Sequence, residues 1–406
     1  MATTITLPRA DGTLERYTLR GPGAFTPAAP GAKLNRIAYS AAHVVADARA
    51  ANDPWLDCTI DWDTTIAYRR RLWAMGLGVA EAMDTAQRGM GLDWPTSLEL
   101  IRRSIDASRD VPGAFLASGC GTDHLAPEAA KSVDDVIRAY EEQMAAIEKL
   151  GGRLILMASR ALARVATSPA DYERVYDRVL RQAKEPVILH WLGDMFDPAL
   201  KGYWGSPDVA AAMATALGVI EANAAKVDGI KISLLDKDQE IAMRRRLPST
   251  GGPEGRGVRM YTGDDFNYAE LIAGDAYGEG SGETPNRRRS DALLGIFDAI
   301  APAASAALAA LAAGDQARFH AILAPTVPLS RHIFKAPTRF YKTGVVFMAW
   351  LNGHQDHFTM VGGQQSARSI LHFAELLRLA DAAGLIEQPE LAARRMRALL
   401  ALHGIE

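Results

Sequence analysis

The stretch that decides the fold is Val227-Asp228-Gly229-Ile230-Lys231-Ile232-Ser233-Leu234-Leu235-Asp236. Ile230 and Ile232 lie on one face of a predicted strand and Lys231 on the other, because successive side chains alternate. In a closed parallel barrel both faces of a strand are buried, which lowers the pKa of a lysine. The neutral amine is the nucleophile that forms a Schiff base with a carbonyl compound. The stretch therefore predicts a catalytic Lys231. The alternative is a lysine at a strand end that points to solvent or pairs with Asp228.

Short apolar runs of this kind recur along the chain and alternate with helical patterns. Eight strand-helix units of about 30 to 40 residues favour an α/β protein whose parallel sheet closes into a (β/α)8 TIM barrel. A doubly wound open sheet is the alternative, but no Gly-x-Gly-x-x-Gly follows the first strand. The predicted strands are 36–39, 77–83, 113–119, 153–157, 186–191, 229–233, 258–263 and 276–280.

The chain divides into three predicted regions. Residues 1–30 form an N-terminal extension, a β-hairpin followed by a linker, because apolar residues alternate around a turn at Asp11-Gly12. Residues 31–289 form the barrel. Residues 290–406 are helical in pattern almost throughout and too many for one closing helix, so they predict a C-terminal helical domain.

Composition excludes several classes of protein. A net charge of -3 leaves no electrostatic footprint for nucleic acid. The two cysteines, Cys58 and Cys120, provide no disulfide framework or thiolate metal site. The most apolar stretch, 299–314, is rich in alanine and too short to span a bilayer, and residues 1–9 lack the pattern of a signal peptide. We expect a cytoplasmic protein with no nucleic-acid or membrane partner.

Polar residues collect where the predicted strands end, which is where barrel enzymes place their chemistry. Arg160 stands in a small, apolar context and is a candidate for holding an anionic or hydroxyl-rich substrate. Asp84 and Asp264 have a purely structural alternative, because either could cap the helix that follows it. His43 has one too, as a helix-capping or core histidine. The residues at the strand ends are His43, Asp84, Thr85, Arg88, Asp123, His124, Arg160, His190, Lys231, Tyr261, Asp264, Asp265 and Glu279.

Short motifs in a fixed order carry a resemblance to a known family. Gly229-Ile230-Lys231, the run from Val258 to Asp265 and the run from Pro186 to Trp191 resemble strands of the dihydrodipicolinate synthase and N-acetylneuraminate lyase superfamily, in one of its longer branches. The resemblance covers roughly residues 34–385. It implies a barrel with a C-terminal helical domain, a Schiff base on Lys231, and a homo-oligomer, either dimer or tetramer.

Two departures from the family pattern concern the substrate. The hydroxyl-rich loop after the second strand is replaced by residues 84–89, in which only Thr85 keeps a hydroxyl. The fourth strand of the family ends in a tyrosine that shuttles protons, and residues 157–162 contain no tyrosine. Carboxylate recognition and proton transfer must therefore be rebuilt here. His190 or Tyr261 could supply the proton relay.

The expected function is that of a class I lyase, an aldolase or dehydratase. Its substrate would be a small-molecule carbonyl compound, either an oxo acid or a sugar-derived keto compound of carbohydrate metabolism. No cofactor is expected, because Lys231 forms the imine itself. The predicted catalytic residues are Lys231, His190 and Asp84, and the predicted substrate-binding residues are Thr85, Arg88, Arg160, His43, Asp264 and Tyr261.

Two other functions remain open. One is a divalent-metal-dependent lyase or isomerase, in which side chains from different strand ends bind Zn²⁺ or Mn²⁺. Its ligands would come from His43, Asp84, His124, His190 and Glu279, although no His-x-His spacing supports it. The other is a non-catalytic sugar-binding homologue, which the missing tyrosine favours and the retained Lys231 opposes.

Overall fold

The computed structural model describes residues 3–83, 88–275 and 285–405 of the chain. Eight parallel strands form a closed barrel in the order β10-β3-β4-β5-β6-β7-β8-β9, which confirms the predicted TIM-barrel fold. The strands are β3 (Ala38–Ser40), β4 (Gly78–Glu81), β5 (Leu116–Cys120), β6 (Leu154–Leu156), β7 (Val187–Leu192), β8 (Val227–Ser233), β9 (Arg259–Thr262) and β10 (Asp291–Leu294).

The barrel forms because its strands bury both faces. Small and branched side chains such as Ala117, Ile155 and Ile188 pack around the axis with Tyr39 and Tyr261. The opposite faces join a much larger apolar core beneath the surrounding helices. Those helices are α1 (Trp62–Ala74), α2 (Trp94–Ser108), α3 (Val133–Lys149), α4 (Arg160–Val165), α5 (Pro169–Gln182), α6 (Val209–Ala222), α7 (Lys237–Arg246), α8 (Tyr268–Ala273) and α9 (Pro285–Arg288).

The last barrel strand differs from the prediction. The expected strand 276–280 lies outside the described residues, and the eighth position is taken by β10, Asp291–Leu294. The predicted end of the barrel at residue 289 is therefore wrong. The reason lies in the sequence itself: three apolar residues of β10 run through Gly295 into the apolar start of the next helix, so the whole stretch has a helical appearance.

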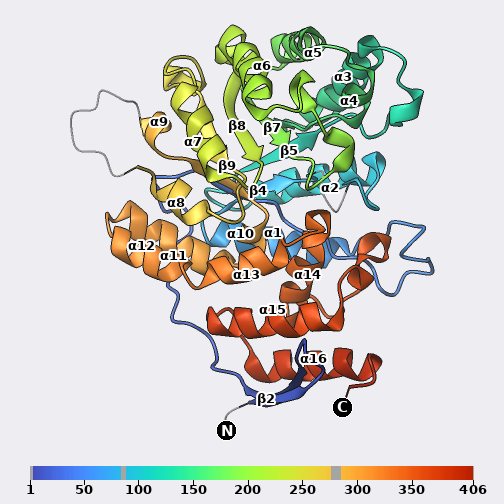
Figure 1. Cartoon of the computed structure of the whole chain (residues 1–406), viewed down its shortest axis with the longest axis vertical. Helices are drawn as coiled ribbons and strands as arrows, with labels where there is room; N and C mark the ends of the chain where they lie inside the picture. Colours follow the sequence, from blue (N-terminus) through green and yellow to red (C-terminus); the bar gives the residue numbers. More distant parts are fainter. Residues whose placement is uncertain (1–2, 84–87, 276–284, 406) are drawn as a thin grey trace.

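Beyond β10 the chain is helical, as predicted. Figure 1 shows these helices stacked against the barrel in the other half of the molecule, with both ends of the chain beyond them. The predicted β-hairpin is also present: β1 (Thr4–Pro8) pairs antiparallel with β2 (Leu14–Thr18). The C-terminal helices are α10 (Ile296–Ala299), α11 (Ala301–Ala312), α12 (Gln316–Leu323), α13 (Thr326–Ile333), α14 (Tyr341–Leu351), α15 (Ile370–Ala382) and α16 (Pro389–Leu402).

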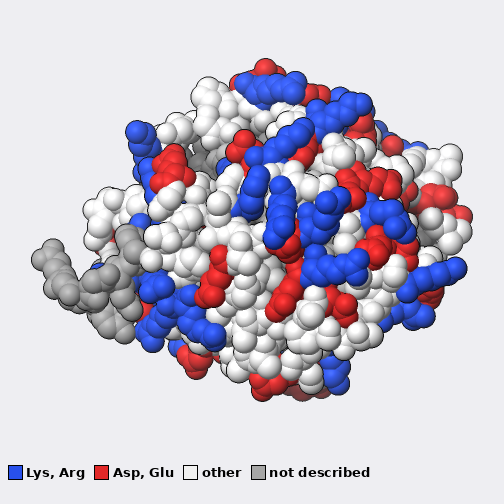
Figure 2. All heavy atoms as spheres, turned by 90° about the horizontal axis from the view of Figure 1, so that it is seen from above, with Lys and Arg blue, Asp and Glu red and all other residues white. Residues whose placement is uncertain are grey.

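The surface carries both signs of charge. In Figure 2, which views the molecule from above the barrel half, lysine and arginine side chains lie among aspartates and glutamates. Arg174 of α5 pairs with Asp134 of α3 at 2.6 Å, and Arg178 pairs with Glu141 at 3.1 Å. This face therefore presents a mixed surface rather than a single-sign patch. Among the helices of the described ranges, none has the length and apolar character that crossing a membrane requires.

Candidate active site

Lys231 lies inside the barrel on β8, with only 7% of the residue exposed. Its register partners are His190 on β7 and Tyr261 on β9, so the three residues occupy one level of the barrel. Gly263, which follows β9, provides the room for the lysine: a Cβ atom at this position would lie 2.8 Å from Lys231 Cε. A larger residue at 263 would displace the side chain. The local sequence thus places a buried amine near the C-terminal ends of the strands.

His190 stands beside this lysine. Its Nε2 lies 3.2 Å from Oγ of Ser233, and the ring is almost fully buried. Ser233 comes two residues after Lys231 and therefore shares its face of β8. His190 on β7 is therefore a neighbour of the lysine across the ladder, and Ser233 is its neighbour along β8. The sequence had predicted His190 as a proton carrier, and the structure brings it to the neighbouring position.

Asp265 is a site residue that the predicted set of substrate-binding residues missed. It is buried after β9, and its Oδ1 accepts a hydrogen bond of 2.8 Å from the backbone N–H of Ile296. Burial raises the pKa of Asp265 to about 7, although the hydrogen bond from Ile296 and the charge of Lys231 lower it in part. A carboxyl group with this pKa can accept or donate a proton near neutral pH.

Asp264, and not Asp265, was predicted from the sequence as a substrate-binding residue, and the structure corrects this prediction. Its Oδ1 accepts hydrogen bonds from the backbone N–H groups of Phe266 and Asn267 at 2.8 and 3.0 Å. Its Oδ2 accepts a further one from the Asn267 side chain at 2.8 Å. Asp264 therefore caps the turn before α8, which was the structural alternative. The doublet 264–265 was the available signal, but only the fold shows which member caps the turn and which does not.

Tyr261 is also misassigned as a substrate-binding residue. Its ring packs against Gly229, where a Cβ would lie 2.6 Å from Cε2 of the ring. Its hydroxyl donates to Oδ2 of Asp228 at 2.5 Å. Asp228 lies at the start of β8, on the N-terminal side of Lys231, so the hydroxyl points away from the ends of the strands where the site lies. Tyr261 is part of the packing that closes the lower barrel.

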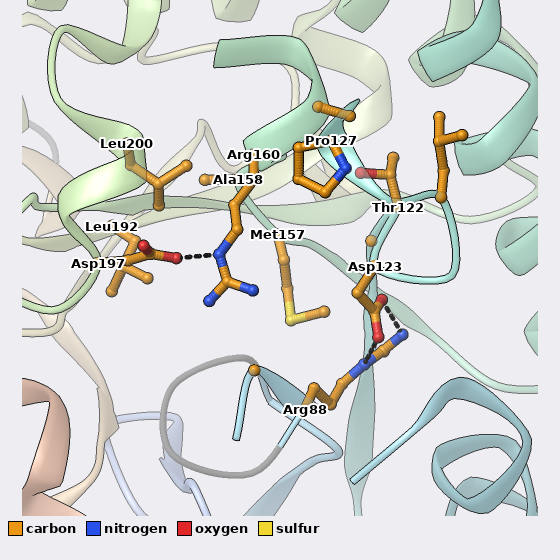
Figure 3. A pocket seen from close by; sticks show the side chains of 14 residues that line it. Arg88, Thr122, Asp123, Pro127, Met157, Ala158, Arg160, Leu192, Asp197 and Leu200 are labelled. Atoms are coloured by element: carbon orange, nitrogen blue, oxygen red, sulfur yellow. Dashed lines mark hydrogen bonds and ion pairs between the residues drawn. The ribbon is translucent and has the colours of Figure 1, made fainter. Parts of the chain in front are cut away.

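A pocket opens at the C-terminal ends of β5, β6 and β7, next to the lysine level. Its empty space, including the part that is open to solvent, amounts to about 530 Å³. Leu192 lines it and faces Ser233 across the β7–β8 ladder, although Lys231 itself does not line it. Figure 3 shows the two arginines of this pocket, Arg88 and Arg160, approaching it from different segments.

Arg88 does not offer its guanidinium to a ligand. Nε donates to Asp123 Oδ2 at 3.1 Å, Nη1 to the carbonyl of Gly119 at 2.7 Å and Nη2 to Gln143 Oε1 at 2.7 Å. The guanidinium also lies 5.1 Å from the centre of the Trp94 ring. Each nitrogen is therefore engaged within the protein. The predicted substrate-binding role of Arg88 is wrong, and it instead ties the loop after β4 to β5 and α3.

Arg160 is arranged differently. Its Nε donates to Oδ2 of Asp197, and the side chain is 39% exposed. In the described part of the chain neither Nη1 nor Nη2 has a hydrogen-bond partner, and both lie over Gly89. Figure 3 shows them directed into the pocket. This pair of donors matches the two oxygens of a carboxylate. The structure thus keeps Arg160 available for the role predicted from sequence.

His43 is a core histidine, which was the structural alternative to a substrate-binding role. It is fully buried beyond β3, where Nδ1 lies 2.9 Å from Asp298 Oδ2 and the backbone N–H donates to the same oxygen at 2.6 Å. Burial lowers the pKa of His43, so the ring is neutral at physiological pH. We assign its proton to Nδ1 from this contact. The residue holds the end of β3 to α10 instead of binding substrate. Asp84 and Thr85 lie outside the described residues.

The predicted metal ligands that the structure describes, His43, His124 and His190, do not converge. His43 is held by Asp298, and Nδ1 of His124 lies 2.9 Å from Gln143 Nε2, whereas His190 is inside the barrel. Asp84 and Glu279 lie outside the described residues. Within the described ranges, no group of three or more histidine, cysteine, aspartate or glutamate side chains could hold a metal ion.

Comparison with known proteins agrees with this architecture. A family model described as "Protein of unknown function (DUF993)" matches residues 5–405. No curated protein sequence matches the chain.

Solved structures of dihydrodipicolinate synthase proteins share the fold at low sequence identity, which confirms the resemblance predicted from the strand motifs. A prophage protein of that family from E. coli K12, solved in complex with pyruvate, is 16% identical with a TM-score of 0.62, over 87% of this chain and 100% of its own. The 4-hydroxy-tetrahydrodipicolinate synthase of Methylacidiphilum fumariolicum is 12% identical with a TM-score of 0.60, over 90% and 99%. The Aquifex aeolicus enzyme is 10% identical with a TM-score of 0.57, over 91% and 98%.

Proposed function

The chain belongs to the DUF993 family, and we propose that it is a Schiff-base-forming lyase, an aldolase or dehydratase acting on a small oxo acid or sugar-derived keto compound. The observation that carries the proposal is the position of Lys231. It is a buried amine at the ends of the strands, beside His190 and close to a carboxyl group whose pKa lies near neutrality. Perturbed titratable groups gathered at such a place are typical of an active site.

The site has the groups that imine formation needs. The neutral amine of Lys231 would attack the carbonyl carbon, and the proton lost from nitrogen would pass to Asp265 or His190. The same group would pass that proton to the alkoxide oxygen, which gives the carbinolamine. A second proton, taken up from solvent through this group, would then protonate the hydroxyl, which leaves as water and gives the protonated imine. The protonated imine then withdraws electrons from the bond between the α and β carbons of the substrate. Cleavage of that bond gives an aldolase. Loss of the α-proton to a base, followed by departure of a β-hydroxyl that takes up this proton and leaves as water, gives a dehydratase.

The pocket favours an anionic substrate. Arg160 presents two donors there that have no partner among the described residues, and a 2-oxo acid carries its carboxylate next to the reacting carbonyl. The pyruvate in the E. coli prophage protein supports the same class of compound. Asp197, which binds Nε, fixes the plane of the guanidinium.

The test is intact mass spectrometry after borohydride reduction in the presence of pyruvate, glyoxylate and a set of sugar-derived oxo acids and keto sugars. We expect a mass increase with at least one of these compounds, because reduction turns the imine into a stable amine. Lys231→Ala should abolish the increase, and Lys231→Arg should also abolish it while keeping the charge.

Lys226 offers a matched control. It lies directly before β8 at the opposite end of the barrel, where its Nζ donates to the carbonyl of Ala183 at 2.7 Å. Lys226→Ala should keep the mass increase. The proposal fails if folded wild-type protein gains no mass with any compound, or if Lys231→Ala gains as much as wild type.

A further inference from the structure

A second buried lysine lies near the candidate site and comes from the helical domain. Lys342 is the second residue of α14 and only 2% exposed. Its Nζ donates to the carbonyl of Ala41, the residue after β3, and lies 3.7 Å from Asp298 Oδ2. It thus brings a cation from α14 to the ends of the barrel strands.

This lysine is placed where a cation is unfavourable. Burial lowers the pKa of Lys342 to about 8, although the carboxylate of Asp298 opposes that shift. The amino end of a helix also disfavours positive charge, because the helix dipole is positive there. A neutral side chain would pack between the two domains at lower cost. The position therefore calls for a reason beyond packing.

Lys342 and Asp265 are anchored on the same short segment. The carboxylate of Asp265 accepts from the N–H of Ile296, and Asp298, the partner of Lys342, lies two residues further along α10. Ala41, which accepts from Lys342, donates its own N–H to the carbonyl of Leu294 at 3.1 Å. The junction of β10 and α10 thus holds the lysine and the carboxylate together.

The buried charges around Asp265 come from several elements. Lys231 on β8 and Lys342 on α14 are the cations that act on it, and Asp264 is an anion beside it. Lys342 in turn meets Asp298 on α10, Arg69 on α1 and the neutral His43 that shares Asp298. The charges of both lysines therefore act on Asp265, and one of these lysines would become neutral during the proposed reaction.

We propose that Lys342 is a positioning residue that favours the ionised form of Asp265 while Lys231 is uncharged. The effect of Lys342 on the pKa of Asp265 does not depend on the proposed function, but the role of that effect in catalysis rests on it. A neutral Lys231 no longer stabilises a buried carboxylate, so a second fixed cation must do so if Asp265 is to accept the proton released from the carbinolamine nitrogen. The helical domain would thereby supply part of the electrostatics of the barrel site.

The test is a pH titration of Asp265. It is monitored by NMR of protein labelled with ¹³C at the aspartate carboxyl carbons. The Asp265 signal is assigned by its loss in Asp265→Asn. Removing a nearby opposite charge raises the pKa of a carboxyl group, so Lys342→Met should move the midpoint upwards. Lys342→Arg, which keeps the charge, should leave it within a few tenths. An unchanged midpoint in folded Lys342→Met overturns the inference.

The double variant Lys342→Met/Asp298→Asn guards against loss of folding, because it removes both members of the buried pair. It should show a smaller upward shift than Lys342→Met, because loss of the Asp298 carboxylate lowers the pKa of Asp265 in part, and a downward shift would overturn the inference. If the proposed function holds, the acid limb of the borohydride-trapping profile should move with the Asp265 midpoint, whereas a merely structural role would lower trapping equally at every pH. Absence of any trapped adduct in wild type would defeat the proposed function but leave the Asp265 titration as an independent result.

Discussion

Substitution of Arg160 tests whether the site recognises the negative charge of a substrate carboxylate. Two of the Arg160 nitrogens are directed into the pocket without a partner in the described part of the chain. Hydrogen bonds to charged groups contribute about 1.5–3 kcal/mol, so Arg160→Met should raise KM for an oxo acid roughly tenfold to a hundredfold. Steady-state kinetics with the acid and with its uncharged amide would measure the difference.

Arg164 provides the control for that experiment, because it lies on the same helix and is exposed. Arg164→Met should leave both KM values unchanged. If Arg160→Met weakens the acid and the amide equally, the guanidinium does not recognise a carboxylate.

At the level of single residues, sequence indicates which positions lie at strand ends but not which way their side chains point. Lys231 and Arg160 were predictable because each is out of place in its local context, a charge within an apolar stretch. Asp264 and Asp265 were indistinguishable, since a one-residue difference in a turn decides which carboxylate caps it. Arg88 was misjudged because its partners, Asp123 and Gln143, are distant in sequence.

At the level of elements, most strands were predictable because a buried parallel strand is a continuous apolar run bounded by polar residues. The exception is β10, where the apolar character continues into the following helix and no boundary is visible. The order of the barrel followed from the alternation of strands and helices. The packing of α14 against the strand ends did not, because long-range contacts leave no local pattern.

The packing of α13 against α15 contains a pair of stacked histidines whose titration should be visible in stability. The rings of His332 and His372 lie 4.2 Å apart. Neither ring nitrogen of the buried His372 has a partner within the described residues. Burial, together with the neighbouring His332, Arg368 and Lys335, lowers the pKa of His372 to about 2.

The expected consequence is loss of stability in acid. The unfolded chain binds a proton at His372 below about pH 6.5, whereas the folded protein does not, so stability falls as pH drops below that value. The loss reaches at most about 2 kcal/mol at pH 5. The free energy of unfolding of His372→Leu, measured by urea denaturation, should therefore rise relative to that of wild type as pH falls from 7.5 to 5. The exposed His320 is the control: His320→Gln should follow wild type, and so would His372→Leu if the interpretation is wrong.

At the level of the whole molecule, the N-terminal hairpin is hydrogen-bonded to the C-terminal helical region. Asp381 of α15 is buried, and its carboxylate accepts from the Tyr17 hydroxyl at 2.7 Å and from the Arg20 backbone N–H at 2.9 Å. Removing a buried acceptor costs about 1–3 kcal/mol, so Asp381→Ala should lower the free energy of unfolding by about that amount. Tyr17→Phe, which removes one of these bonds, should cost about 1 kcal/mol. Equal stabilities for both variants and wild type would show that these hydrogen bonds contribute nothing to stability.

The central claim is that one particular lysine forms the imine, and peptide mapping of the borohydride-reduced protein tests it most directly. Tandem mass spectrometry would locate the added mass among the lysines after reduction with the most reactive carbonyl compound of the panel. We expect it on Lys231. An adduct on Lys342, the other buried lysine, or on an exposed lysine with Lys231 unmodified would contradict the account.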